Sequence, residues 1–342
     1  MIKGRNGDLF FIAEMSGNHN HSLARAKAIV EAAAEAGADA IKLQTYTADT
    51  MTIDKSDGEF FIKDPKNLWN GESLYALYQK AYTPWEWQEE LFAHAKKCGI
   101  LCFSTPFDAT AVNFLERLDA PMYKIASFEN IDLPLIRRVA KTRKPLIAST
   151  GMATVAELDD LMRTARANGC PDVTLLKCTS NYPATPEGTN LRTIPHLREL
   201  FHCRVGLSDH TLGIGAAIAS IALGATVIEK HFTLARSDGG VDSAFSMEPK
   251  EFAQLVRECR TAYEALGDIT YEPQPQEKNS FVFRRSLYVV KDVKKGERFT
   301  EENVRSIRPG LGLPPKYLDV VLGKIAARDI ARGEAMAWEM VE

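Results

Sequence analysis

The chain lacks the features of a secreted or membrane protein. Its six cysteines include no Cys-x-x-Cys pair, and its first residues lack a basic region followed by an apolar run. No apolar stretch approaches the roughly 20 residues that cross a bilayer, the Gly/Ala-rich segment Gly213–Gly224 included. We therefore expect a cytoplasmic protein that does not enter a membrane.

An excess of charge of one sign is also absent. Lys+Arg 42 nearly balance Asp+Glu 45, and the formal net charge is -3. No global field attracts nucleic acid or an anionic surface, so we expect no nucleic-acid partner and expect anionic ligands to be bound locally.

At 342 residues with 45% hydrophobic content, the chain exceeds the size typical of a single core, which favours two domains.

Short apolar segments alternate with amphipathic helical patterns along most of the chain. Eight segments are predicted strands: Leu9–Met15, Ala40–Thr45, Leu101–Thr105, Met122–Ser127, Pro145–Thr150, Val173–Thr179, Arg204–Asp209 and Val227–Phe232. The clearest predicted helices are Leu23–Ala36, Trp85–Lys97, Val155–Ala167 and Glu251–Leu266. Eight strand–helix units over roughly 270 residues are typical of an α/β (β/α)8 TIM barrel. An open, doubly wound sheet would produce similar local signals and stays the alternative.

Two regions depart from this repeat. The insertion Thr47–Thr83 is long and rich in aromatic residues, which is consistent with a lid over the barrel mouth or with a small packed subdomain. The second region is residues 271–280, where Glu, Pro and Gln are frequent. This composition is typical of an extended linker. We therefore predict a barrel over residues 1–270, a linker over 271–280 and a small β-rich domain over 281–342. Because so small a domain has a marginal core, docking on a barrel would stabilise it.

A pair of histidines follows two neighbouring predicted strands. His210 and His231 bracket the helical stretch Gly213–Gly224, so both imidazoles would emerge at the same end of the sheet, roughly 5 Å apart. Two imidazoles are too few for a closed structural zinc site, but they suit an octahedral Mn²⁺ or Mg²⁺ ion completed by water and substrate oxygens. The alternative is that both rings cap strand ends.

Lysines within apolar strands require a partner. Lys42 and Lys124 each lie between apolar neighbours, and Lys177 and Lys230 follow similar runs. Hydroxyl donors from Ser127, Ser149 and Ser208 would lie near the same rim, which indicates a site for an anion. A lysine in a barrel strand could also form a Schiff base with a carbonyl substrate, as in class I aldolases.

Carboxylates accompany these groups. Glu14 ends the first predicted strand, and its position at the mouth suits substrate orientation or proton transfer. Asp209 and Glu229 adjoin the histidines and are further candidates for outer-sphere or acid/base roles. We expect Glu14 or Glu229 to transfer a proton.

Six motifs in order along the chain resemble those of the sialic acid synthase family, whose members condense phosphoenolpyruvate with an amino sugar. The motifs are Ile12-Ala13-Glu14 with Asn18-His19-Asn20, Lys42-Leu43-Gln44-Thr45, Tyr123-Lys124-Ile125-Ala126-Ser127, Ser149-Thr150-Gly151-Met152, Gly206 to Thr211, and Glu229 to Thr233. The tail, with Arg308-Pro309-Gly310, is similar to the antifreeze-like (SAF) domain that closes those enzymes. The first motif, the stretch Leu43 to Thr50 and the stretch Ala81 to Trp87 look most like the pseudaminic acid branch of the family, and the branches that make N-acetylneuraminate or legionaminic acid are the alternatives.

This resemblance implies specific roles. His210 and His231 would bind the metal, while Lys42, Lys124, Ser127, Ser149 and Ser208 would hold the carboxylate and phosphate of phosphoenolpyruvate. Glu14, Gln44, Tyr182 and Asp242 would face the reacting centre or the sugar. Some relatives carry Asn where this chain has Ser180, so the amide could come from Asn181 instead.

The resemblance also implies a substrate and an assembly. The sugar would be an open-chain 2,4-diacetamido-2,4,6-trideoxy sugar, whose methyl group is compatible with Met15 and the aromatic insertion. Arg308 would reach the sugar site of the other subunit, which makes a domain-swapped homodimer. A non-catalytic sugar-binding protein is a further alternative, although a pure binder has no need of two lysines and two histidines on one face.

Overall fold

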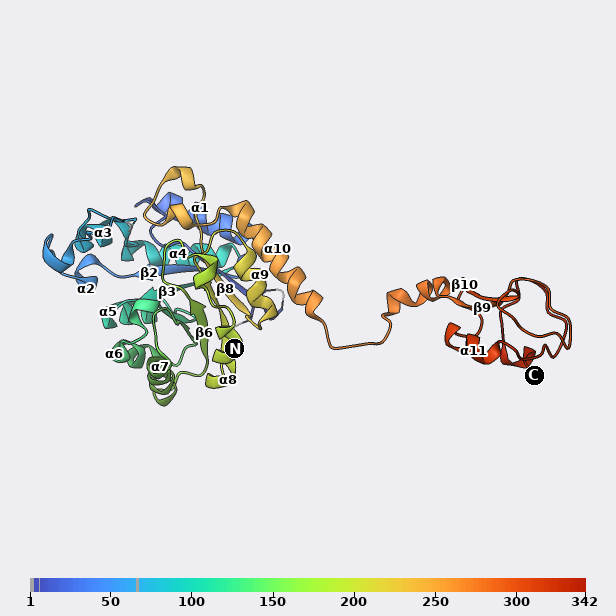
Figure 1. Ribbon diagram of the computed structural model, residues 1–342. Helices are drawn as coiled ribbons and strands as arrows, with labels where there is room; N and C mark the ends of the chain where they lie inside the picture. Colours follow the sequence, from blue (N-terminus) through green and yellow to red (C-terminus); the bar gives the residue numbers. More distant parts are fainter. Residues whose placement is uncertain (1–2, 6, 66–67) are drawn as a thin grey trace. The chain divides into compact units, whose positions relative to one another are not determined.

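The chain folds into two compact units, which a computed structural model describes over residues 3–5, 7–65 and 68–342 (Figure 1). The first unit is Met1–Gly267 and the second is Asp268–Glu342. Among the described residues, no helix combines the length and apolar character that crossing a membrane requires. All six cysteines carry free thiols.

Eight parallel strands of the first unit close into a barrel, with each strand paired to the next and β8 paired to β1 (Figure 1). The strands are β1 Phe10–Glu14, β2 Ala40–Thr45, β3 Leu101–Pro106, β4 Tyr123–Ile125, β5 Leu146–Ser149, β6 Val173–Cys178, β7 Arg204–Asp209 and β8 Val227–His231. The predicted (β/α)8 barrel is confirmed, and the open-sheet alternative is wrong because β1 and β8 close the sheet.

Helices surround the barrel and connect its strands (Figure 1). They are α1 Leu23–Glu35, α4 Trp85–Lys97, α5 Ala109–Arg117, α6 Leu133–Ala140, α7 Val155–Ala167, α8 Thr193–Phe201, α9 Gly215–Ala222 and α10 Pro249–Leu266. Polar side chains start several of them: Ser22 caps α1, Asp108 caps α5, and Thr154 forms a capping box with Glu157 at α7. These caps satisfy amide groups that the first helical turn leaves without partners.

Side chains alternate between two layers along each strand. On β1, Phe11 and Ala13 pack outward against the helices, whereas Phe10 and Ile12 belong to a separate core inside the barrel. The inner core is formed by Phe10, Ile12, Ala40, Phe103, Met122, Ile147, Leu176 and Val227. By the same alternation, the next inward position on β1 is Glu14. The barrel interior therefore holds a packed apolar core at the amino-terminal ends of the strands and polar side chains at their carboxyl-terminal ends.

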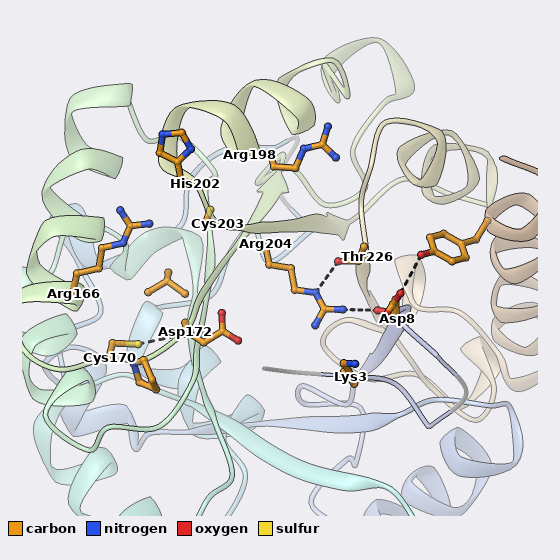
Figure 2. Close-up of a pocket in the computed structure, with 13 residues that line it drawn as sticks. Lys3, Asp8, Arg166, Cys170, Asp172, Arg198, His202, Cys203, Arg204 and Thr226 are labelled. Atoms are coloured by element: carbon orange, nitrogen blue, oxygen red, sulfur yellow. Dashed lines mark hydrogen bonds between the residues drawn. The ribbon is translucent and has the colours of Figure 1, made fainter. Parts of the chain in front are cut away.

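Basic side chains gather at the amino-terminal end of the barrel, around the start of β7 (Figure 2). The Nε atom of Arg204 donates to Thr226 Oγ1 at 2.8 Å, and its Nη2 atom donates to the Asp8 carbonyl. Arg166 Nη2 donates to the Phe201 carbonyl at 2.5 Å. These arginines bind backbone and loop oxygens and so tie the chain together at the end opposite the polar groups.

The described part of the insertion after β2 includes the α-helices α2 Ala48–Met51 and α3 Leu74–Ala81 and a 3₁₀ helix, Gly58–Phe60. Trp69 Nε1 donates to the Val241 carbonyl at 3.0 Å, and the ring of Tyr46 packs edge-on against Tyr78. The described residues of the insertion therefore border the barrel mouth, and the expectations of a lid and of a small subdomain stay predictions.

The second unit has its own core. Strands β9 Ser286–Val289 and β10 Val304–Ile307 pair antiparallel, and a short helix, α11 Leu318–Val321, follows. Leu287, Val289, Phe299 and Val304 are fully or almost fully buried. The preceding Ile269 and Tyr271 are almost completely exposed, and a 3₁₀ helix spans Pro275–Phe283, so the predicted linker is helical in its second half.

Candidate active site at the barrel mouth

A cavity of about 420 Å³ opens at the carboxyl-terminal ends of the strands. The predicted site residues that line it are Glu14, Lys42, Gln44, Lys124, Ser127, Ser149, Tyr182, Ser208, His210, Glu229, His231 and Asp242. They come from β1, β2, β4, β5, β7 and β8 and from the loops that follow the strands. Catalytic groups of TIM barrels are built at this end of the strands, which makes the cavity the candidate active site.

Two lysines and two carboxylates form the floor of the cavity. Lys42 Nζ lies 2.5 Å from Glu14 Oε2 and 3.8 Å from Glu229 Oε1, and Lys124 Nζ lies 2.8 Å from the same Glu229 oxygen. All four side chains are at most 6% exposed. Burying four charges is costly unless each is paired, and here the positive and negative charges alternate in space.

The two carboxylates are not equivalent. Burial raises the pKa of Glu14, and the charge of Glu229 raises it further, against the opposing effect of Lys42. Burial also acts to raise the pKa of Glu229, but Lys124 and Lys42 together outweigh it and lower that pKa below its ordinary value. The environment therefore favours the ionised form of Glu229 and favours protonation of Glu14 more than an ordinary glutamate.

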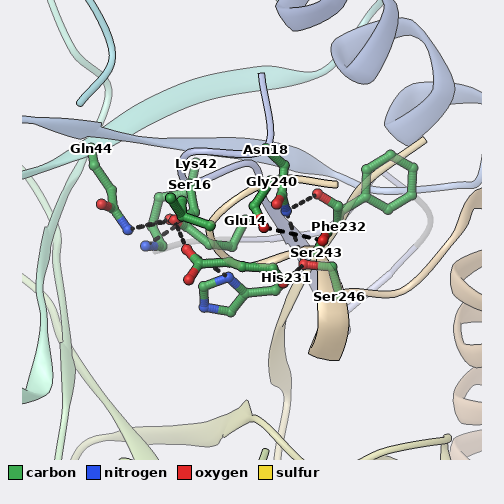
Figure 3. A network of polar contacts seen from close by, with 12 residues as sticks. Glu14, Ser16, Asn18, Lys42, Gln44, His231, Phe232, Gly240, Ser243 and Ser246 are labelled. Atoms are coloured by element: carbon green, nitrogen blue, oxygen red, sulfur yellow. Dashed lines mark hydrogen bonds and ion pairs between the residues drawn. The ribbon is translucent and has the colours of Figure 1, made fainter. Parts of the chain in front are cut away.

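Glu14 is held by several partners. Gln44 Nε2 donates to Glu14 Oε1 at 2.9 Å and lies 3.3 Å from Ser16 Oγ. Ser16 in turn donates to Asp242, so one polar network joins the ends of β1 and β2 to the loop after β8 (Figure 3). Asp242 Oδ2 also lies 3.9 Å from His231 Nδ1.

The two histidines lie side by side, with ring centroids 5.4 Å apart. His210 Nδ1 lies 3.0 Å from the Thr179 carbonyl, which only accepts, so this nitrogen carries a proton and Nε2 is the nitrogen left for a ligand. Burial acts to lower the pKa of His210, but the contact with Cys178 outweighs it and raises that pKa above its ordinary value, so a metal at Nε2 would compete with a proton. Burial lowers the pKa of His231 well below its ordinary value, so that ring is neutral. Its Nδ1 atom has no hydrogen-bond partner within the described residues.

These properties fit a divalent metal. Neutral imidazoles with free lone pairs are metal ligands, and a backbone carbonyl that fixes the tautomer of one of them is a usual outer-sphere partner. Within residues 3–5, 7–65 and 68–342, no group of three or more His, Cys, Asp or Glu side chains is arranged to hold an ion. The pair supplies two ligands, so an ion held there would take its remaining ligands from water and substrate oxygens.

Hydroxyl groups line the side of the cavity next to Lys124. Ser208 Oγ donates to Glu229 Oε1 at 3.2 Å, and Ser127 Oγ accepts from the Gly151 amide at 3.2 Å. A side chain at Gly151 would place its Cβ 2.5 Å from Ser127 Oγ, so glycine is required there. The buried Ser149 Oγ and Glu229 Oε2 have no hydrogen-bond partner in the described part of the chain, which indicates that a polar ligand satisfies them.

Several predicted groups lie outside this cavity. Ser180 is half-buried beside Cys178, and Asn181 is exposed because its amide closes a tight turn onto the Thr179 carbonyl at 2.9 Å. Neither lines the cavity, and Met15 is fully buried against the helices instead. Asp209 and Lys230 also lie outside it, since they point outward where Ser208 and Glu229 point inward.

Lys177 also lies elsewhere. Lys177 Nζ donates to the carbonyl of Cys178 at 2.8 Å and lines a different surface hollow. Arg308 is exposed and belongs to the second unit.

Sequence reasoning missed other residues of the cavity. Ser16, Cys178 and Glu129 all line it. Ser16 lies beyond the end of β1 with φ at 48°, so strand alternation does not predict the direction of its side chain. Burial raises the pKa of Glu129 to about 7, and this carboxyl reaches the cavity from a single turn of 3₁₀ helix, Ser127–Glu129, that no strand or helix pattern predicts.

Comparisons with known proteins agree with this architecture. The NeuB family model matches residues 29–271, more than half of the chain, and the SAF domain model matches residues 284–342. The chain is 48% identical to a pseudaminic acid synthase of Campylobacter jejuni over 328 residues, covering 96% of this chain and 95% of that protein. It is 45% identical to a pseudaminic acid synthase of Helicobacter pylori, covering 97% of each chain. An N,N'-diacetyllegionaminic acid synthase of Campylobacter jejuni is 39% identical, covering 94% of this chain and 97% of that protein.

Solved structures give the same picture. An N-acetylneuraminic acid (sialic acid) synthetase from Leptospira borgpetersenii in complex with citrate superposes with a TM-score of 0.71 at 31% identity, covering 82% of this chain and 94% of that one. A putative spore coat polysaccharide biosynthesis protein E from Chromobacterium violaceum superposes with a TM-score of 0.72 at 26% identity, covering 98% and 99%. The resemblance that the six motifs carry is thus confirmed, and the chain belongs to the NeuB family and ends in a SAF domain.

Proposed function

We propose that the protein is a pseudaminic acid synthase. It condenses phosphoenolpyruvate with 2,4-diacetamido-2,4,6-trideoxy-L-altrose and releases phosphate. A bond forms between C3 of phosphoenolpyruvate and the aldehyde carbon of the sugar, water adds at C2, and phosphate leaves by cleavage of its C–O bond. The observation that carries the proposal is the 48% identity to a pseudaminic acid synthase over nearly the full length of both chains, against 39% for a legionaminic acid synthase.

Phosphoenolpyruvate binds at the floor of the cavity in this proposal. Its carboxylate and phosphate would be held by Lys42 and Lys124 and by the hydroxyls of Ser127, Ser149 and Ser208. Two features support this placement: the lysines converge on one buried point, and Ser149 Oγ lacks a partner among the described residues. Charge-assisted hydrogen bonds from buried lysines are stronger than neutral ones and suit a trianionic substrate.

His210 and His231 would hold a divalent cation, Mn²⁺ or Mg²⁺. When bound, the cation polarises the aldehyde oxygen of the sugar and so makes the carbonyl carbon more electrophilic. Asp242, which lies 3.9 Å from His231 Nδ1, would orient that ring or a water molecule beside it.

Glu14 and Glu229 have different roles in the proposed reaction. Glu14 is the proton carrier, because burial raises its pKa and Gln44 holds it in place. Glu229 stays ionised between Lys42 and Lys124, and its negative charge would stabilise positive charge that develops at C2 of phosphoenolpyruvate. Of the two carboxylates that the sequence left open, we therefore propose Glu14 as the group that transfers the proton.

The sugar would lie between this floor and the insertion. Gln44, Tyr182 and Asp242 offer polar contacts, with the backbone of Ser180 and Asn181 framing the loop that carries Tyr182. Met51, Leu74 and Leu77 supply an apolar wall that suits a methyl group. Arg308 of a second copy would complete the sugar site, so that the enzyme is a domain-swapped homodimer, and we place it in the cytoplasm.

The Schiff-base alternative is disfavoured by the ion pairs. An amine that attacks a carbonyl must be neutral, whereas Lys42 and Lys124 both contact ionised or ionisable carboxylates within 2.8 Å. Although burial lowers the pKa of Lys124, removal of its proton would leave Glu229 with one counter-charge fewer in a buried site.

Phosphate release with three sugars tests the proposal. The purified protein is incubated with phosphoenolpyruvate, Mn²⁺ and the L-altro sugar, the corresponding D-manno diacetamido sugar, or N-acetylmannosamine. The L-altro sugar should have the highest kcat/KM, and a preference for either other sugar would contradict the assignment. With phosphoenolpyruvate labelled by ¹⁸O at the bridging oxygen, the label should appear in phosphate, whereas label in the sugar product would contradict C–O cleavage.

A further inference from the structure

A buried ion pair lies just outside the candidate active site, at the ends of β7 and β8. Asp209 and Lys230 are register partners on these neighbouring strands. Lys230 Nζ lies 2.7 Å from Asp209 Oδ2, and each side chain is only 1% exposed. Because side chains alternate along a strand, both point to the outer layer, while Ser208 and Glu229 point into the cavity.

This pair brackets one of the two histidines. Asp209 Oδ1 accepts from the amide and the hydroxyl of Thr211, at 2.9 Å and 2.8 Å. Lys230 Nζ also donates to the Thr211 carbonyl at 2.5 Å. The residues directly before and after His210 are therefore both bound to Lys230, and the next residue along β8 is His231.

The contacts link the two imidazoles through a short path. His210 leaves β7 with its carbonyl bound to the Ala184 amide at 3.0 Å and its Nδ1 atom at the Thr179 carbonyl. Those contacts hold the histidine to the loop after β6, and Lys230 ties the residues on both sides of it to β8. Strands β7 and β8 also lie in close contact at Gly206, because a Cβ atom there would clash with the Val227 carbonyl. The ring separation of 5.4 Å thus depends on how firmly β7 and β8 are joined.

Stability alone does not account for an ion pair at this position. Two charges that are removed from water lose their hydration, and well-packed apolar residues of similar volume are often as stabilising as a buried pair. A pair whose two members also hold the loop around His210 does something that apolar residues cannot do, because dispersion contacts do not fix a backbone carbonyl and amide in one orientation.

We propose that the Asp209–Lys230 pair is a positioning device that sets the separation and orientation of His210 and His231. The role rests on the metal site given under Proposed function, and it adds two residues that lie outside the cavity. Neither side chain touches substrate or metal. Both act through the backbone of the histidines, so the pair determines how well the two ring nitrogens converge on one point.

The test uses the full-length double variant Asp209→Asn/Lys230→Met. It removes both charges together and leaves no buried charge without a partner, while the side-chain oxygen of the introduced amide can still accept from Thr211. In metal-free crystals, the separation of the two ring centroids should change by about 0.5 Å or more relative to the wild type. Mn²⁺ affinity, measured from the electron paramagnetic resonance signal of the free ion, should fall about 10- to 100-fold.

Asp39→Asn is the matched control at the opposite end of the barrel. Asp39 is a buried carboxylate that accepts from the amides of Arg5 and Phe11, so its loss also weakens the fold. This variant should melt at a lower temperature and keep the Mn²⁺ affinity of the wild type. If it weakens Mn²⁺ binding as much as the double variant does, general loosening is the cause and the positioning role is wrong.

Two further outcomes would overturn the inference. An unchanged ring separation in the double variant contradicts it, and so does an unchanged Mn²⁺ affinity. Wild-type protein that binds no Mn²⁺ would instead contradict the metal site itself, and the ring separation would then still decide whether the pair positions the histidines.

Discussion

Lys124 and Glu229 form an ion pair at the centre of the barrel, with Nζ 2.8 Å from Oε1 and side chains 2% and 6% exposed. The same Glu229 oxygen lies 3.8 Å from Lys42. Glu229 therefore lies within reach of both buried ammonium groups, while Glu14 is the nearer partner of Lys42. This arrangement links substrate binding to catalysis, because the lysines that attract an anion are the ones that Glu229 partly neutralises.

Glu229→Gln should separate these two effects. The isosteric amide removes the negative charge, so the KM for phosphoenolpyruvate should fall, because the two lysines become less neutralised. The kcat should fall by about 100-fold or more, since stabilisation of the developing positive charge is lost. Steady-state kinetics measures both parameters. Glu251→Gln, which breaks an exposed pair with Arg236, is the control and should change neither. A kcat close to the wild-type value would contradict the role of Glu229.

His231→Ala should abolish Mn²⁺ binding while the barrel stays folded. Truncation of this ring breaks no hydrogen bond at Nδ1 within the described part of the chain, whereas His210→Ala also loses the contact to the Thr179 carbonyl. Isothermal titration with Mn²⁺ and thermal unfolding by circular dichroism check the two statements. His94→Ala, which removes a surface histidine paired with Glu31, should retain binding. Undiminished affinity in the His231 variant would mean that the ion binds elsewhere.

Glu129 should make stability depend on pH. Burial raises the pKa of Glu129 in the folded protein to about 7, above its ordinary value of 4.5. The folded state therefore holds this proton more firmly than the unfolded state does. Its contribution is fully present below pH 4.5 and is lost as pH rises towards 7, with a slope of up to about 1.4 kcal/mol per pH unit.

Urea unfolding of Glu129→Gln at several pH values tests this linkage. The glutamine variant should lose less stability than the wild type between pH 5 and pH 7. Glu187→Gln changes an exposed carboxylate and should follow the wild-type curve. Parallel curves for the wild type and the Glu129 variant would show that Glu129 does not titrate in this window.

Arg308→Ala should weaken use of the sugar without unfolding the protein. Arg308 is exposed, and its neighbours are held by hydrogen bonds from Ser286 Oγ to the Pro309 carbonyl at 2.7 Å and from the Gly310 amide to the Val282 carbonyl at 2.9 Å. Loss of one charge-assisted contact corresponds to about a 10- to 100-fold rise in the KM for the sugar. The KM for phosphoenolpyruvate should not change, and Arg305→Ala on the same unit is the control.

Mixed dimers test whether Arg308 acts across subunits. When Arg308→Ala and His231→Ala proteins are unfolded together and refolded, some dimers combine an intact barrel of one chain with an intact SAF unit of the other. Activity at low sugar concentration should then exceed that of either variant refolded alone. No gain in activity would contradict a shared site.

The sequence by itself determined the barrel and the charged floor of the cavity. Alternation with a period of two is a local property, so an inward series such as Phe10, Ile12 and Glu14 is readable once a strand is recognised. The same alternation predicts that the side chains of Lys42 and Glu229 point into the barrel interior. The spacing of two strand ends in a sheet likewise predicted the distance between His210 and His231 to within about 1 Å of the observed ring separation of 5.4 Å.

Only the tertiary structure decided the groups that depend on loops and on the outer layer. Glu129 reaches the cavity because one turn of 3₁₀ helix curls back, and Asn181 points away from it because of a tight turn. Asp209 and Lys230 form an ion pair on the outer face of the barrel wall rather than at the rim of the cavity. Loop backbones follow no fixed period, and their path depends on contacts with residues far along the chain, so local patterns cannot place their side chains.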